Sequence, residues 1–168
     1  MSSHIPSCEG VKSTMPEHIA LELVELTLTE LIETLRNSQE GYKELGHRLH
    51  DGQAKHFFLE ETQRRAAYAA ELENELHRMG VHDVKASMTP GGKARLLWGK
   101  VQASMAGGQK SLLSAAVEGD EAAAKIYVQA LKNELPLPLR EMLARQLAHI
   151  QRAHDEVRAL YYLDRNEA

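Results

Sequence analysis

A few polar side chains interrupt rows of apolar residues, at positions where they could act together. Read at spacings of three and four residues, the sequence gives four rows of inward-facing side chains that are apolar almost throughout. Each row is interrupted near its middle, by Gln39, by Glu61 with Arg65, by Asp120 and by His154. Burying such groups without partners costs several kcal/mol, so we expect them to contact one another or a ligand.

One interpretation is a metal site. In carboxylate-bridged di-iron and di-manganese bundles, two helices each provide a Glu and the other two each provide a Glu-x-x-His pair. Here that pattern is incomplete, because Gln151 stands where the acid before His154 is expected. We therefore predict Glu61, Asp120, Glu121 and His154 as candidate ligands of a divalent ion, Fe or Mn, with a single ion favoured over a dinuclear centre.

The other interpretation is a closed polar network without a cofactor. Arg65 would bring a positive charge to the place where a metal cation would sit, and it could pair with Glu61 or Asp120. Glu61 and Arg65 have the favourable i,i+4 order of an ion pair within one helix. His154 would then hydrogen-bond Asp120, Gln39 or a tyrosine hydroxyl. No catalytic residues are predicted, because no Ser/His/Asp constellation is visible, and both interpretations stay open at this point.

Four long helices must position these side chains. Hydrophobic periodicity predicts helices over about 16–49, 53–79, 109–134 and 139–163. Asp51-Gly52 is a turn signal, Gly80 is a natural helix end, and Pro136 and Pro138 separate the last two helices. We predict an all-α four-helix bundle over residues 17–165, a single domain. In it, two antiparallel hairpins are joined by a long crossover with a short extra helix near 93–105, after a disordered tail at 1–16.

Composition excludes several classes of protein. The chain has 168 residues, a formal net charge of −4 and one cysteine. An acidic balance argues against nucleic-acid binding, and a lone cysteine excludes a disulfide framework. The sequence has no apolar run long enough to span a membrane and no secretory signal, so we expect a soluble cytoplasmic protein. The start of the first helix has more apolar residues than one face needs to pack against the rest of the bundle. This predicts a homodimer or a helical interaction module. The apolar residues are Ile19, Leu21, Leu23, Val24 and Leu26.

Several segments, in order, resemble an uncharacterised bacterial family, a domain of unknown function with a ferritin-like four-helix bundle that is often grouped with stress-associated proteins. The matching segments are Leu31–Leu35, Gln39–Tyr42, Arg65–Leu72, Glu118–Ala122 with Tyr127, and Leu147–Asp155. The resemblance covers residues 24 to 163 and includes Arg65 and His154. It implies a ferritin-like bundle of two antiparallel hairpins joined by a crossover. Our first hypothesis is a non-enzymatic bundle with a role in a stress response. Val117 and His47 each stand at a position where the resemblance to the family leads us to expect an acidic residue. A di-metal carboxylate oxidase or iron-handling protein is the alternative.

Overall fold

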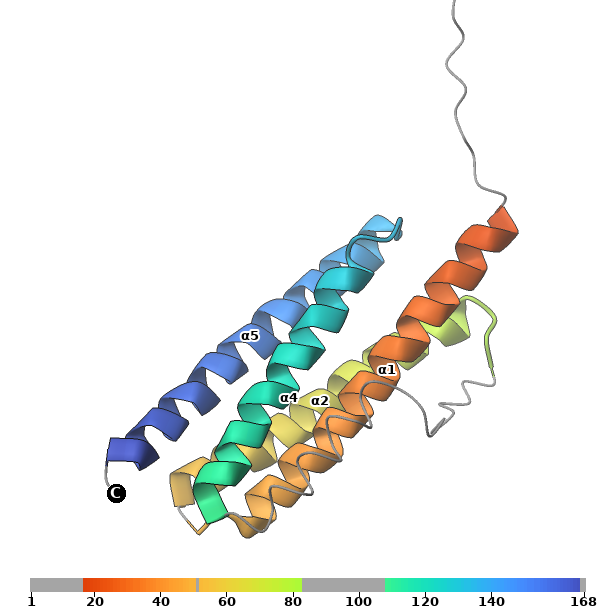
Figure 1. Ribbon diagram of the computed structural model, residues 1–168. Coiled ribbons are helices and arrows are strands. Elements are labelled where there is room, and N and C mark those ends of the chain that lie inside the picture. Colours follow the sequence, from red (N-terminus) through yellow and green to blue (C-terminus); the bar gives the residue numbers. More distant parts are fainter. Residues whose placement is uncertain (1–16, 51, 83–107, 167–168) are drawn as a thin grey trace, which may run out of the picture.

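Four helices make up the fold of the computed structural model, which describes residues 17–50, 52–82 and 108–166 (Figure 1). They are α1 (Glu17–Arg48), α2 (Gly52–Arg78), α4 (Gly108–Ala130) and α5 (Leu137–Asn166). The described residues contain no strand, so the predicted all-α four-helix bundle is confirmed. The predicted tail at 1–16 and the predicted short helix at 93–105 lie outside the described residues.

The helices form two antiparallel hairpins, α1 with α2 and α4 with α5, that lie side by side (Figure 1). Helices α2 and α4 run in the same direction, so α2 ends and α4 begins at opposite ends of the bundle. The segment that joins them, where the crossover is predicted, lies outside the described residues. None of the described helices has the length and apolar character needed to cross a bilayer.

Local chemistry sets the helix ends. Gly80 has a φ of 88°, and the amides of Gly80 and Val81 donate 3.0 Å hydrogen bonds to the carbonyls of His77 and Leu76, which closes α2 as predicted. Helix α4 ends at Ala130 and not at the predicted 134. The Arg140 guanidinium donates to the carbonyls of Leu131 and Asn133 at 3.1 and 3.0 Å, and so binds the chain where it leaves α4.

The start of α5 also differs from its predicted place. The helix begins at Leu137, two residues earlier than predicted, so Pro138 lies inside its first turn. There the missing proline N–H costs nothing, because the first amides of a helix have no partner within the helix. Pro136 therefore separates the helices as predicted, whereas Pro138 belongs to the first turn of α5.

The apolar core consists of two clusters. The upper cluster contains Leu28, Leu31 and Leu35 of α1 with Leu143 and Ile150 of α5. The lower cluster includes Leu45 and Leu49 of α1, Phe58 of α2, Leu113 of α4 and Val157 of α5. The charged side chains of Glu61, Arg65 and Asp120 are buried as well. The expected polar layer in an apolar core is therefore present.

The two hairpins meet along two different seams. At the α1–α4 seam, α1 presents small buried polar residues, Thr27, Thr34 and Ser38, on one face, and Asn133 after α4 donates a 3.0 Å hydrogen bond to Thr27. At the α2–α5 seam the backbones approach each other less closely. Small side chains let helices pack closely, so the α1–α4 seam is the tighter of the two.

Candidate functional site: a buried ionic layer

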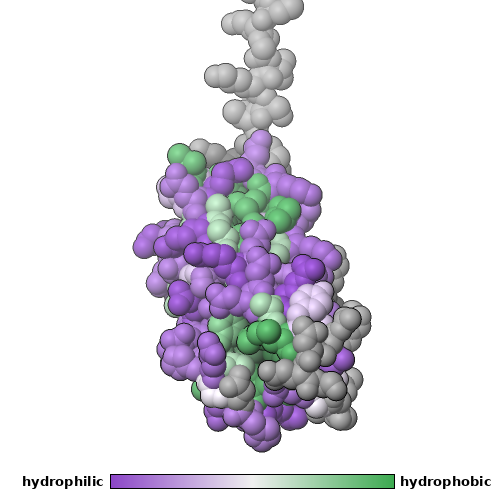
Figure 2. Space-filling model, turned by 90° about the vertical axis from the view of Figure 1, so that its left-hand side faces the viewer, coloured by the Kyte–Doolittle hydropathy of each residue, from purple (hydrophilic) through white to green (hydrophobic). Residues whose placement is uncertain are grey.

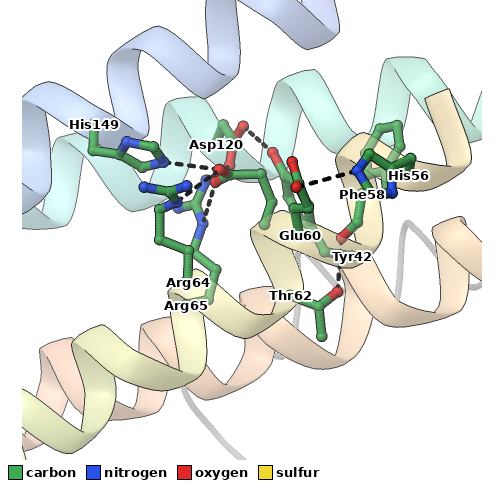
Figure 3. Close-up of polar contacts among 10 residues, drawn as sticks. Tyr42, His56, Phe58, Glu60, Thr62, Arg64, Arg65, Asp120 and His149 are labelled. Atoms are coloured by element: carbon green, nitrogen blue, oxygen red, sulfur yellow. Dashed lines mark hydrogen bonds and ion pairs between the residues drawn. The ribbon is translucent and has the colours of Figure 1, made fainter. Parts of the chain in front are cut away.

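Arg65 of α2 is the centre of the buried layer. Its side chain has no exposed surface, and Nη2 donates a 3.0 Å hydrogen bond to Oδ1 of Asp120 on α4. Its Nε lies 3.7 Å from Oε2 of Glu61 one turn earlier, and its guanidinium carbon lies 5.0 Å from the ring centre of Tyr42. Figure 3 shows Arg65, Asp120 and His149 turned toward one another between three helices. A tethered cation thus faces two buried carboxylates and an aromatic ring.

Asp120 is held by two donors from different helices. Besides Arg65, the hydroxyl of Tyr42 on α1 donates a hydrogen bond to Oδ2 of Asp120. Burial raises the pKa of Asp120 above its usual range, although Arg65 and the Tyr42 hydroxyl act in the opposite direction. Burial and the Asp120 charge raise the pKa of Tyr42 well above 10.0, so this hydroxyl keeps its proton. Tyr42 therefore links α1 to α4 as a permanent donor.

Glu61 connects the layer to the last helix. Its Oε1 lies 2.8 Å from Nε2 of His149 on α5 and 3.4 Å from Nε of Arg64. The His149 ring also packs edge-on against Tyr68, with ring centres 5.7 Å apart. Since Tyr42, Arg65, Glu61, Asp120 and His149 come from all four helices, the layer joins both hairpins through polar contacts.

A second polar group lies between α2 and α5, toward the upper end of the bundle. Gln146 of α5 is fully buried; its Oε1 accepts a 2.7 Å hydrogen bond from the hydroxyl of Tyr127, and its amide donates one of 2.8 Å to Glu71. Arg145 donates to the same carboxylate oxygen of Glu71 at 3.0 Å. The bonds of Gln146 and Arg145 to Glu71, and the contact between Glu61 and His149, are polar bridges across the α2–α5 seam, whereas the Tyr127 bond lies within the α4–α5 hairpin.

The four predicted ligands are divided between two places. Glu61 and Asp120 both face Arg65, as the network interpretation expected. His154 lies with Nε2 3.6 Å from Oε1 of the exposed Glu121. The predicted hydrogen bond from His154 to Asp120, Gln39 or a tyrosine was wrong: Nε2 has no hydrogen-bond partner among the described residues, and Nδ1 lies 3.5 Å from Asp155. The charge of His154 nevertheless acts to lower the pKa of Asp120. The rotation of α5 about its axis directs His149, and not His154, toward Glu61 in the buried layer.

This donor set does not fit a dinuclear metal centre. Arg65 occupies the space between the two buried carboxylates. Of the four predicted ligands, only Glu121 and His154 are then left to bind a metal ion, fewer than the four or more ligands that divalent ions usually take. Within the part of the chain that the structure describes, no three His, Cys, Asp or Glu side chains gather as a group able to hold a metal ion. Binding of a single Fe or Mn ion stays a prediction.

Sequence reasoning missed His149 and Gln146. The predicted inward row of α5 passed through Leu147 and His154, whereas the buried face is centred on a row turned toward α2 that includes Gln146 and Ala153. The sequence contains a signal for them: Gln146 and His149 are three residues apart, and each directly precedes an apolar residue, Leu147 and Ile150. Gln39, which we expected in the layer, is only half-buried, and Ser38 beside it is buried.

The start of α1 offers a smaller apolar surface than the sequence suggested. Val24 belongs to the core, while Leu21 and Leu26 are 46% and 69% exposed. Five residues apart, these two lie about 140° apart around the helix, so they do not form one strip. The homodimer therefore stays a prediction that rests chiefly on Leu26.

Comparison with known sequences finds one family. Residues 24–133 match the family described as Domain of unknown function (DUF2383). The matched segment contains Tyr42, Glu61, Arg65 and Asp120, and ends before His149. No curated protein matches the chain.

Proposed function

The chain belongs to the DUF2383 family, whose description names no activity, and we propose from its geometry that it is a non-catalytic helical module that needs no metal ion. In this proposal the buried layer is structural: it sets the height at which the two hairpins meet. The observation that carries it is the position of Arg65, bonded to Asp120 and facing Glu61.

Electrostatics support this proposal. Two buried carboxylates repel each other and need a countercharge, which metal ions provide in di-metal bundles. Here the countercharge is covalently attached to α2, and Arg64 adds a second one at the exposed edge of Glu61. A metal ion would have to displace a guanidinium that has no exposed surface and so no route into water without opening the bundle.

The resemblance to ferritin-like bundles is supported by helix order alone. The parallel direction of α2 and α4 matches the helix order of ferritin-like folds, in which a single long crossover joins the two hairpins (Figure 1). We therefore propose a ferritin-like arrangement in which an arginine takes the central position. A stress-related role stays a prediction from the resemblance.

Elemental analysis of protein purified without an affinity tag tests the proposal. We expect well under one Fe or Mn ion per chain, and no change in the thermal unfolding midpoint when either ion is added. Arg65→Met is the companion variant, because it removes the tethered cation while leaving Glu61, Asp120 and His149 in place. About one or more ions per wild-type chain, lost in His154→Ala, would overturn the proposal.

A further inference from the structure

The two seams between the hairpins differ in how they are held. The α1–α4 seam is packed closely through small buried side chains, including Thr27, Thr34 and Ser38. The α2–α5 seam is more widely spaced, and polar bridges cross it: Glu61 with His149, and Glu71 with Gln146 and Arg145. Polar bridges exchange readily with water, whereas close packing does not.

The layer behind the α2–α5 seam is incompletely satisfied. Nε and Nη1 of Arg65 and Oε2 of Glu61 are buried and have no hydrogen-bond partner among the described residues. Each such atom carries a desolvation penalty that contact with water would relieve. Water entry at this level therefore costs less free energy than entry at an apolar level of the same bundle.

Figure 2 shows the bundle from its left-hand side in Figure 1, where α5 lies. Hydrophobic side chains gather there in an upper and a lower area, with hydrophilic residues between them. A polar band at mid-height is the surface through which water would most easily pass.

We infer that the two hairpins open along the α2–α5 seam while the α1–α4 seam stays closed, admitting water and small polar solutes to Arg65. The closely packed α1–α4 seam acts as the hinge. The bridges from Glu71 and Glu61 to α5 act as the latch, and they break in the open state. The Tyr42 to Asp120 bond links α1 to α4 at the hinge and is retained, whereas the Arg65 to Asp120 bond crosses between the hairpins and is replaced by water in the open state. This motion goes beyond the proposed function, since a metal-free module could equally be rigid.

Thiol labelling under native conditions tests the motion on the full chain, with Cys8 replaced by Ser so that one thiol is present. Ala153→Cys places the probe on α5, where the native side chain is 2% exposed. Ser38→Cys places a matched probe on α1 at the hinge, where the native side chain is 5% exposed. We expect Cys at 153 to react at least about tenfold faster than Cys at 38, with a weaker dependence on urea, because a partial opening exposes less surface than unfolding.

A matched pair of variants identifies the latch. Glu71→Ala removes the bridges to Gln146 and Arg145, while Glu73→Ala removes the contact with Arg36 inside the α1–α2 hairpin. We expect Glu71→Ala to speed labelling at 153 by about 3- to 10-fold and Glu73→Ala to leave it unchanged, since opening keeps each hairpin intact. Circular dichroism confirms that each variant folds.

Two results would overturn the inference. Equal labelling rates at 153 and 38, with equal urea dependence, would show that only complete unfolding exposes either site. Labelling at 153 that does not respond to Glu71→Ala would show fraying of α5 and no opening of the seam.

Discussion

Arg65 and Asp120 are 55 residues apart in the sequence, yet they form a 3.0 Å hydrogen bond between α2 and α4 in a place where neither side chain has exposed surface. The two helices belong to different hairpins. The bond therefore ties the hairpins together through the middle of the core.

Removing the central cation should be the most damaging single change in the layer. Arg65→Met leaves Asp120 buried without its countercharge and leaves Glu61 with that of Arg64 alone, and we expect the free energy of unfolding to fall by about 3–5 kcal/mol. Urea unfolding followed by circular dichroism measures the change. The control is Arg64→Met, whose native side chain is 49% exposed and whose loss should cost less than about 1 kcal/mol. Equal losses in the two variants would contradict a central role for Arg65.

The charge of Asp120 should make stability depend on pH in a defined direction. Burial raises the pKa of Asp120 above 3.8 in the folded protein, so the folded state favours its protonated form. The stability contributed by this preference is complete below the unfolded pKa and is lost as the pH rises through the folded pKa.

Asp120→Asn isolates this contribution. The free energy of unfolding of the wild type, minus that of Asp120→Asn, should decrease as the pH rises from about 4 toward neutrality. Urea unfolding at several pH values measures it, and taking the difference cancels the other carboxylates. A difference that increases with pH would show that Arg65 outweighs burial.

The hydroxyls of Tyr42 and Tyr127 provide a matched comparison. Both tyrosines are buried, but Tyr42 donates to a carboxylate and Tyr127 donates to the amide oxygen of Gln146. Because bonds to charged groups are stronger, Tyr42→Phe should cost about 1.5–3 kcal/mol and Tyr127→Phe about 0.5–1.5 kcal/mol. Thermal or urea unfolding of the two variants checks the order, and the reverse order would argue against an ionised Asp120.

The two histidines of α5 should differ in importance. His149→Ala removes a 2.8 Å contact with the buried Glu61, so we expect a loss of about 1–3 kcal/mol. His154→Ala should cost less than about 1 kcal/mol, because its Nε2 has no hydrogen bond to lose. Urea unfolding of both variants decides. A larger loss of stability in His154→Ala than in His149→Ala would support the layer that the sequence predicted, with His154 in it.

A homodimer through α1 would have to cover Leu26, which is the most exposed large apolar side chain among residues 20–48 of that helix. If the predicted dimer forms, light scattering should give twice the mass of one chain, and Leu26→Lys should return it to one. Val128→Lys on α4, which replaces another exposed apolar residue, should leave the mass unchanged. A single-chain mass for the wild type would reject the dimer.

Much of the bundle follows from local patterns. The spacing of Leu28, Leu31 and Leu35, or of Leu72 and Leu76, can bury apolar surface only as one face of a helix. Gly80 ends α2 where the sequence predicted, since the left-handed conformation needed there suits glycine. The burial of Arg65, Glu61 and Asp120 follows in the same way, because each replaces an apolar residue in its row.

The sequence by itself thus determined four helices, their apolar faces and a charged layer at mid-height, because these depend on periodicity within each helix. Only the tertiary structure decided the partners. His149 and His154 lie about 140° apart around α5, and which of them faces the buried layer depends on how α5 is rotated about its axis, which no local pattern records. The pairing of Arg65 with Asp120, and the difference between a tight seam and a loose one, depend on how the hairpins pack, which is a property of all four helices together.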